Sequence, residues 1–524
     1  MSEPDAKPTP PPPIVVGGRA PGRAHHPRGL AVLFVTELWE RFSFYGMRSL
    51  LTLYMTRVLR YSDRRAYGVY GAYGALVYAC PLAGGVLADR LLGYRVAVLL
   101  GAVLMALGHF VMAIRHELAL YAALALLCLG NGFFKPNISS LVGRLYAPGD
   151  PRRDAGFTIF YMGINTGAFL APLVCGSLGE RVDWHWGFGL AGVGMLIALL
   201  WFGRGRAALE GHGEPPSLEA LTARRWLGLD ALQLTLLGSL AAVPLLALAL
   251  QRPQLLGWLL YGAGAAVYGG LIWAALRADV TTRGRLLLAL VLMACSTVFW
   301  ALFEQAGSSL TLFAERHVDR SLAHGPLGAL LSTLAPGARL KELPASVLQA
   351  ANPLFLIVLA LPVAALWTAL KRRAADPSTP NKFGLALLQL GLGYLVLVAG
   401  TAWADAQARV PLHWLLALYL LHTMGELCLS PIGLSAMTRL APPRLASTVM
   451  GAWFLASSYS HHFGGLIASM TALPNTAAGA APAAAAALQQ YAMVFTRLGY
   501  LALAVGALLL VGARWLRRPL RGLE

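Results

Sequence analysis

Long apolar segments alternate with short polar ones from residue 30 to residue 513 of this chain. A helix needs about 20 predominantly apolar residues to cross a bilayer. We predict fourteen such helices, near residues 30–56, 67–88, 93–114, 118–142, 157–179, 187–203, 229–250, 255–276, 286–313, 347–370, 383–403, 412–437, 445–471 and 490–513. Glycine and proline inside these segments suit membrane helices, because neighbouring helices can satisfy the backbone groups that they free. The pattern therefore predicts an all-α membrane protein.

The polar stretches divide the predicted helices into groups. A wide break near 203–226 and a basic loop near 277–285 flank two helices with almost no charge. Removing that pair leaves six helices on each side. We predict a first six-helix bundle at 28–205, a linker with an inserted helix hairpin at 206–282, and a second six-helix bundle at 283–524. Two six-helix bundles resemble the architecture of major facilitator transporters.

Composition and charge agree with a membrane protein. Hydrophobic residues make up 57% of the chain and charged residues 13%, whereas soluble domains carry about 25% charged residues. Lys and Arg are concentrated in the loops that share a side with both chain ends, and the positive-inside rule places that side in the cytoplasm. The net charge of +18 then faces anionic lipid, and no nucleic-acid partner is expected. One predicted outer loop breaks the rule with Arg57, Arg60, Arg64 and Arg65.

Several features argue against processing, disulfides and enzyme chemistry. Residues 1–27 are proline-rich without a long apolar core, so we expect a disordered cytoplasmic tail rather than a signal peptide. The five cysteines lie in apolar segments without CxxC spacing, which predicts buried thiols rather than disulfides or a metal site. His461 and His462 point about 100° apart on a helix, so we interpret them as packing or polar contacts. Without Walker, GxSxG or HExxH motifs, neither an enzyme nor a cofactor other than protons is expected.

The first predicted helix contains charges that lipid should reject. Glu37, Glu40 and Arg41 lie on one helix face, and Arg48 follows two turns later. Each charge at membrane depth costs about 2.5–3.5 kcal/mol on insertion scales. Such charges usually pair and line a polar cavity, so we predict a relay for protons or substrate. An ion cluster that only locks helices together is the alternative.

Other helices contain polar residues that together could bind a zwitterion such as a peptide. Arg41, Arg48 and Lys135 in the first half could bind a carboxylate. Glu426 in the second half could bind an ammonium group, and the remaining contacts could come from Asn165 and Asn352. Opposite charges from the two halves would therefore face one central cavity.

Each of these residues also has a purely structural interpretation. Lys135 could neutralise Glu37 or Glu40, and the glutamates at 304 and 426 could be protonated and packed. The asparagines could make interhelical hydrogen bonds. Tryptophans often lie at the membrane interface, but Trp300 and Trp453 fall inside predicted helices, which favours pocket walls. Tyrosine hydroxyls could join this lining from Tyr45, Tyr78 and Tyr161.

Six motifs carry a resemblance to known transporters. GGVLADRLLGYR, with Asp89, Arg90 and Arg95, resembles the signature loop of the major facilitator superfamily. ELWERFSFYG is similar to the ExxERFxYYG motif of the proton-dependent oligopeptide transporters, the POT or PTR peptide transporter family, although Phe44 replaces its first tyrosine. FYMGINTGA, GNGFFKPNISS, FWALFEQAGSS and GELCLSPIGLS resemble that family's fifth, fourth, seventh and tenth helices.

The resemblance implies roles for residues of this chain. Proton coupling is implied for Glu37, Glu40, Arg41 and Glu304. The resemblance agrees with the two charged ends of the site, and together with the positions of the aromatic residues we predict peptide binding by Arg41, Arg48, Lys135, Asn165, Asn352, Glu426, Tyr45, Tyr78, Tyr161, Trp300, Trp453 and Ser430. The loop with Asp89, Arg90 and Arg95 is implied in gating.

We therefore predict a proton-coupled importer of di- and tripeptides that works by alternating access. It would be a monomer in a bacterial inner membrane, with both termini in the cytoplasm and with peptides, protons and the lipid bilayer as partners. A transporter of another small solute, such as a nitrate-like anion or an amino-acid derivative, is one alternative. A peptide sensor that does not transport is the other.

Overall fold

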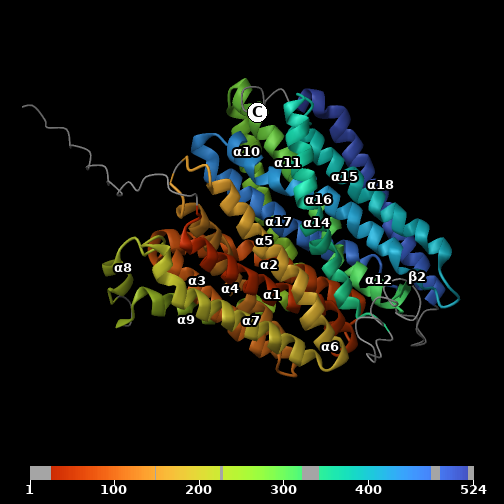
Figure 1. Cartoon of the computed structure of the whole chain (residues 1–524), viewed down its shortest axis with the longest axis horizontal. Coiled ribbons are helices and arrows are strands. Elements are labelled where there is room, and N and C mark those ends of the chain that lie inside the picture. The colour runs from red at the N-terminus through yellow and green to blue at the C-terminus, as the bar shows by residue number, and fades with distance from the viewer. Residues whose placement is uncertain (1–24, 148, 225–227, 322–341, 474–483, 517–524) are drawn as a thin grey trace, which may run out of the picture.

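The computed structural model describes residues 25–147, 149–224, 228–321, 342–473 and 484–516. Most of the predicted disordered tail therefore lies outside the described residues. The described part is almost entirely helical (Figure 1). The first half contains the long helices α1 (Arg28–Arg57), α2 (Asp63–Leu87), α3 (Gly93–Met112), α4 (Glu117–Arg144), α5 (Arg153–Ala171) and α7 (Trp184–Gly205), and the short segments η1 (Ala88–Leu92), η2 (Pro172–Gly176) and α6 (Ser177–Arg181).

The second half repeats this pattern of long helices joined by short segments. Between the halves lie η3 (Arg206–Leu209), α8 (Leu218–Thr222), α9 (Ala231–Gln251) and α10 (Pro253–Arg277). The second half contains α11 (Val280–Phe303), η5 (Glu304–Gly307), α12 (Ser309–His317), β1 (Val318–Asp319), η6 (Ala345–Ala350), α14 (Ala351–Arg372), α15 (Thr379–Gly400), η7 (Thr401–Trp403), β2 (Val410–Pro411), α16 (Leu412–Leu440), η8 (Pro443–Leu445), α17 (Ala446–Ser469) and α18 (Ala484–Leu516). The two short strands pair in parallel.

Eleven helical segments of the described chain are long and apolar enough to cross a membrane. One of them, Asp63–Met112, contains both α2 and α3. The long helices α1 and α17 are not among the eleven, and α1 is the helix with the buried charges. The helical membrane fold is thus confirmed, whereas the number fourteen stays a prediction.

Two large clusters of buried apolar side chains lie in the two halves. Leu33, Phe134 and Phe188 belong to the first cluster, and Phe299 and Phe495 to the second. In Figure 1 the red to yellow helices α1, α3, α4 and α7 lie apart from the blue-green to blue helices α15, α16 and α18. The domain boundaries proposed from the sequence remain predictions.

The two halves are in close contact where α2 crosses α17. A Cβ atom added to Gly71 of α2 would lie 2.9 Å from the Cα atom of Gly465 and 2.9 Å from the carbonyl oxygen of His461. Without side chains at these glycines, the two backbones can come into direct contact. An added side chain at Gly71 would therefore force the two helices apart.

The inserted hairpin contacts both halves. Helix α9 begins with a capping box between Asp230 and Gln233 and packs against α4. Helix α10 packs against α11 and α17. The Tyr459 hydroxyl donates to the Leu260 carbonyl oxygen at 2.7 Å, and the Tyr268 hydroxyl donates to the Ala452 carbonyl oxygen at 3.0 Å. The hairpin is thus attached to the second half by hydrogen bonds and to the first half by packing.

The predicted gating loop is held by the linker that follows the first half. The chain turns at Gly93, whose φ of 70° suits glycine. The Tyr94 hydroxyl donates to Asp89 at 2.6 Å. Arg95 donates to the carbonyl oxygen of His212 at 2.7 Å and forms an ion pair with Glu214 at 2.9 Å. Arg90 is exposed.

The five cysteines are all unpaired. Cys80 is partly buried, and the other four are buried: Cys128, Cys175, Cys295 and Cys428. Their burial confirms the prediction that they pack as small apolar side chains.

Candidate functional site

A polar cavity of about 350 Å³ lies between the halves. Its lining includes thirteen of the residues predicted from the sequence: Glu37, Arg41, Tyr45, Arg48, Tyr78, Lys135, Tyr161, Asn165, Trp300, Glu304, Asn352, Glu426 and Ser430. Glu40 is buried beside Arg41, and Trp453 lines an adjoining cavity. Asp89, Arg90 and Arg95 are not among the lining residues. The charges from separate helices therefore face one chamber, as the sequence analysis required.

Three charged side chains of α1 form one buried cluster. The Arg41 guanidinium binds Glu40 through two nitrogens, with Nη2 2.6 Å from Oε1, and its Nε lies 3.3 Å from Oε1 of Glu37. All three side chains are buried. The second carboxylate oxygen of Glu37 has no hydrogen-bond partner among the described residues. The cluster thus holds two carboxylates against one arginine, and neutralising a carboxylate would weaken the grip on Arg41.

Arg48 connects the two halves. Its Nη2 donates to Oε2 of Glu304 at 2.6 Å, and its Nε donates to the Tyr70 hydroxyl at 2.8 Å. Thr52, one turn further along α1, donates to the Gly307 carbonyl oxygen at 2.7 Å. Helix α1 is therefore tied to η5 by a partly buried ion pair and a neutral hydrogen bond. The sequence analysis singled out Arg48 and Glu304 separately but did not predict this pair.

Lys135 forms no ion pair with a carboxylate within the described residues. Its Nζ atom lies 3.4 Å from the Tyr78 hydroxyl and 4.4 Å from the centre of that ring. Lys135 makes no direct ion pair with Glu37 or Glu40 in the described part of the chain, although its charge acts on Glu37 at longer range. The lysine charge is available to the cavity.

Glu426 lies in the second half with neutral partners. Nδ2 of Asn352 donates to Oε2 of Glu426 at 2.9 Å and lies 3.0 Å from the hydroxyl of Thr423. No Lys or Arg of the described chain forms an ion pair with Glu426. Asn165 donates to the Tyr161 carbonyl oxygen of its own helix at 2.8 Å. The cavity thus has a cation in the first half and a carboxylate in the second half, each without an opposite charge bound to it.

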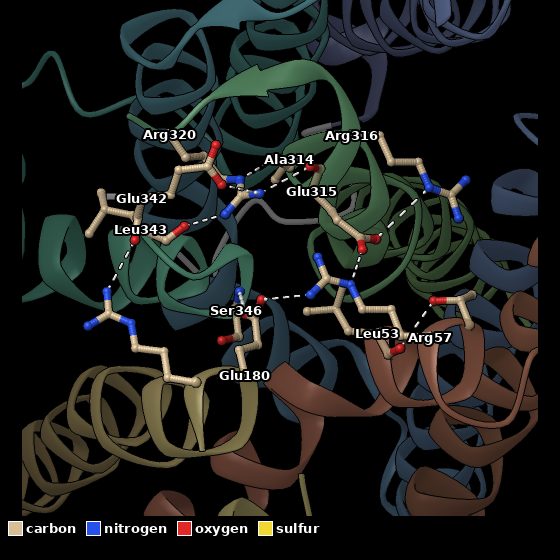
Figure 2. Close-up of polar contacts among 12 residues, drawn as sticks. Leu53, Arg57, Glu180, Ala314, Glu315, Arg316, Arg320, Glu342, Leu343 and Ser346 are labelled. Carbon is tan, nitrogen blue, oxygen red and sulfur yellow. Dashed lines mark hydrogen bonds and ion pairs between the residues drawn. The ribbon is translucent and has the colours of Figure 1, made fainter. Parts of the chain in front are cut away.

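Ion pairs close one end of the molecule, which we call the ion-pair end (Figure 2). Arg57 of α1 pairs with Glu315 of α12 and lies 3.6 Å from Glu180 of α6. Arg316 binds both oxygens of Asp63 at 2.6 and 2.9 Å. Glu342 pairs with Arg320 at 3.5 Å and with Arg409 at 3.2 Å. Two of these ion pairs, Arg57 with Glu315 and Arg316 with Asp63, join the first half to the second.

The cavity reaches the opposite end, which we call the open end. Its lining includes Ser139 near the end of α4 and Tyr161 in the first part of α5, both with exposed side chains. A chamber closed at one end by ion pairs and reaching exposed residues at the other is the geometry of a carrier that faces one side of a membrane.

Sequence reasoning missed residues that support the chamber from behind its lining. Tyr70 and Thr423 complete the contacts of Arg48 and Asn352. His461, which the sequence analysis interpreted as a packing or polar contact, lines an adjoining cavity and stacks on Tyr78, with ring centres 4.8 Å apart. A hydroxyl or an imidazole in an apolar helix is a weak sequence signal, because such groups often make local hydrogen bonds only.

Helices around a polar chamber that is closed at one end define a membrane transporter. The model of the POT family matches residues 95–484, and the chain belongs to that family. The peptide transporter YePEPT of Yersinia enterocolitica is 37% identical over 84% of this chain and 87% of its own length. Dipeptide and tripeptide permease B of Salmonella typhimurium is 31% identical over 95% of this chain and 97% of its own.

Solved structures agree with this assignment. A mutant of the peptide transporter POT in complex with alafosfalin has a TM-score of 0.75 and 33% identity, and the match covers 94% of this chain and 96% of that one. A POT family transporter in complex with 5-aminolevulinic acid has a TM-score of 0.77 and 28% identity, over 94% and 97% of the two chains.

Proposed function

We propose that this protein imports di- and tripeptides together with protons. The observation that carries the proposal is the placement of Lys135 and Glu426, which face one cavity from opposite halves without an opposite charge bound to either. The printed names of the relatives support peptides as the substrate class. We further propose a monomer in a bacterial inner membrane, with both termini and the open end on the cytoplasmic side.

The two charged ends of a peptide would bind on opposite sides of the cavity, one near Lys135 and the other near Glu426. The carboxylate of the peptide would meet Lys135, and Arg41 once it is released from its glutamates. The ammonium group would meet Glu426, which Asn352 orients by its hydrogen bond. Aromatic side chains from both halves, such as Tyr78 and Trp300, would cover the middle of the peptide.

Protons would act on two carboxylate–arginine contacts. Protonation of Glu40 or Glu37 would loosen Arg41 and let it bind the peptide carboxylate. Protonation of Glu304 would release Arg48 and remove an ion pair between α1 and η5. The halves could then separate at the ion-pair end, and rocking of one bundle against the other would provide alternating access.

Uptake of labelled dialanine into proteoliposomes with an imposed proton gradient tests the transport function. We expect accumulation with the gradient and only equilibration without it. In Glu40→Gln and Arg41→Ala, the gradient-driven component should be lost. Full proton-driven uptake by both variants, together with normal counterflow, would show that the cluster of α1 is not part of the coupling.

Peptides with blocked ends test the binding geometry. Amidation of the carboxylate should weaken binding to the wild-type protein by about 10- to 100-fold, because a charged hydrogen bond is lost. In Lys135→Gln this penalty should shrink, while the penalty for an acetylated amino end stays. Glu426→Gln should show the reverse. Equal affinity of the wild-type protein for free and blocked peptides would exclude the two-ended site.

A small amino-acid derivative is a second candidate substrate. The favouring observation is the structural match to a POT family transporter in complex with 5-aminolevulinic acid. Such a molecule also carries an ammonium and a carboxylate group. Competition of dialanine uptake by this compound, by nitrate and by dipeptides separates the candidates, and binding of peptide without flux would indicate a sensor.

A further inference from the structure

An open groove of about 730 Å³ lies where the inserted hairpin meets both halves. Its walls come mainly from α2 of the first half, α17 of the second half and α10 of the hairpin. Among the described residues, none lines both this groove and the transport cavity. Small-molecule sites typically have volumes of about 300–1,000 Å³. The groove is therefore a separate space that is large enough for a ligand.

Close contacts between the three helices hold the groove in shape. A Cβ atom added to Gly68 of α2 would lie 3.3 Å from the ring of Pro253 of α10. A Cβ atom added to Gly257 of α10 would lie 2.8 Å from the ring of His462 of α17. The same imidazole lies 3.0 Å from the Tyr261 hydroxyl. The groove thus exists before any ligand binds.

The polar side chains of the groove gather near the start of α2 and the junction of α9 with α10. They are Ser62, Arg64, Arg65, Gln251 and Gln254. The described lining contains two arginines and no aspartate or glutamate. Guanidinium groups bind phosphate well, because their donors match the geometry of its oxygens. This polar end therefore has the charge and the chemistry of a phosphate site.

The carboxylates closest in sequence to these arginines, or paired with them, are already bound. Arg316 binds both oxygens of Asp63. Glu117 is paired with Arg65 at 2.6 Å. Arg64 is exposed and forms no ion pair within the part of the chain that the structure describes. Its charge is one of those that break the positive-inside rule, and it remains available to a ligand in the groove.

The rest of the groove is apolar and follows α10 into the membrane. Trp258, of which 73% is exposed, and Leu466 of α17 line this part. Tyr261 lies about 12 Å from Pro253 along α10, at a rise of about 1.5 Å per residue. Tryptophan is enriched where membrane meets water. A charged end followed by an apolar channel at this depth matches the shape of a phospholipid.

We propose that the groove binds one anionic phospholipid, with its phosphate at Arg64 and one acyl chain along Trp258 and Leu466. The lining favours an anionic lipid over a zwitterionic one, because it offers cations to the phosphate but no carboxylate to a choline or ammonium group. The bound lipid would contact both halves and the hairpin at the ion-pair end. The proposal concerns the membrane around the protein and does not rest on the substrate that the protein transports.

Quenching of Trp258 fluorescence by brominated lipids measures this binding. The protein is reconstituted in phosphatidylcholine vesicles that contain brominated phosphatidylglycerol or brominated phosphatidylcholine at the same low mole fraction. The Trp258 signal is the difference between each protein and its Trp258→Phe counterpart. In the wild-type protein we expect the anionic lipid to be preferred about fivefold or more, the effect of one arginine near an anionic headgroup.

Three variants locate the headgroup. Arg64→Gln should lower the preference about fivefold. Gln254→Glu places a carboxylate at the polar end and should lower it as well, because like charges repel. Arg60→Gln is the matched control, since Arg60 is exposed in the same segment but does not line the groove. It should keep the wild-type preference.

Four results would overturn the proposal. Equal quenching by the two lipids in the wild-type protein would exclude a site for anionic lipid. An unchanged preference in both Arg64→Gln and Gln254→Glu, or the same loss in Arg60→Gln, would exclude the polar end as the headgroup site. Loss of the preference with inorganic phosphate, but not with chloride at equal ionic strength, would indicate a site for free anions. No peptide is present, so these outcomes are independent of the proposed transport.

Discussion

The contact between Arg48 and Glu304 is the residue-scale feature with the clearest consequence. Both side chains are mostly shielded from water, with side-chain exposures of 11% and 9%, and they belong to opposite halves. In Glu304→Gln the charge is lost while the size is kept. We expect loss of gradient-driven peptide accumulation with counterflow retained, because a neutral residue no longer exchanges a proton. Parallel uptake and counterflow assays on proteoliposomes measure both quantities.

Glu117→Gln is a matched control for this prediction. Glu117 also pairs with an arginine, Arg65, at 2.6 Å, but both are about half exposed and lie outside the cavity. Exposed ion pairs contribute about 0–1 kcal/mol. The control should transport like the wild-type protein, and equal accumulation by Glu304→Gln would contradict a coupling role for Glu304.

Sequence reasoning predicted which residues form the site better than it predicted which residues they contact. The i, i+4 spacing of Glu37 and Arg41 predicted a contact that is present at 3.3 Å. Glu304 had no nearby cation in sequence, since Arg48 is 256 positions away. Charges in apolar helices are visible in a sequence because lipid rejects them, whereas the pairing of charges on distant helices depends on how the halves pack.

At the scale of elements, the crossing of α2 and α17 predicts the effect of a single methyl group. Gly71→Ala would place a Cβ atom 2.9 Å from backbone atoms of α17. Overpacking of this kind typically costs about 1–3 kcal/mol. We expect a lower thermal unfolding midpoint in detergent and slower dialanine uptake.

Gly269→Ala in α10 provides the comparison, because an added Cβ atom there meets nothing within 4 Å. Its unfolding midpoint should be unchanged or slightly raised, since alanine restricts the unfolded chain. Similar effects of the two substitutions would show that the crossing is not tightly packed.

The positions of helices were predictable from long apolar segments, but which helices pack against one another was not. The helical angle between His461 and His462 predicted that they point apart. Which of them faces the cavity follows from Gly74 of α2 on one side and Tyr261 of α10 on the other. The same holds for the inserted hairpin. Its apolar sequence predicted two membrane helices but could not predict that they pack against α17.

At the scale of the whole molecule, the ion-pair end predicts how the conformational equilibrium responds to mutation. Arg57→Gln would leave Glu180 and Glu315 without this partner, and both are largely buried. Because the Arg57 side chain is 38% exposed, its loss should cost less than the roughly 3–5 kcal/mol of a fully buried ion pair, but more than that of an exposed pair. We expect opening at this end to become more frequent, seen as faster backbone hydrogen exchange in peptides from α12 and η6.

The control for this experiment is Arg65→Gln, because Arg65 lies in the same arginine-rich segment but pairs with exposed Glu117. Exchange in α12 should match the wild-type rate in that variant. Unchanged exchange in Arg57→Gln would mean that the remaining ion pairs hold the end closed without Arg57.

The ion-pair end explains part of the excess of arginine in the predicted outer loop at residues 57–65. Arg57 and Arg65 are bound by carboxylates from other elements, whereas Arg60 and Arg64 are exposed. A rule that counts charges in loops cannot register such neutralisation, because the partners lie far away in the sequence. The family, by contrast, could be inferred from short motifs because they contain the charges themselves.

The packing of the cysteines has a practical consequence for following the motion of the halves. Buried thiols of this kind are chemically inert towards water-soluble reagents, and here only Cys80 is even partly accessible. Paired spin labels or fluorophores can therefore be attached to new surface cysteines on the two halves while the native thiols stay in place. Distances between such probes would report each stage of the transport cycle in a chain whose interior is unaltered.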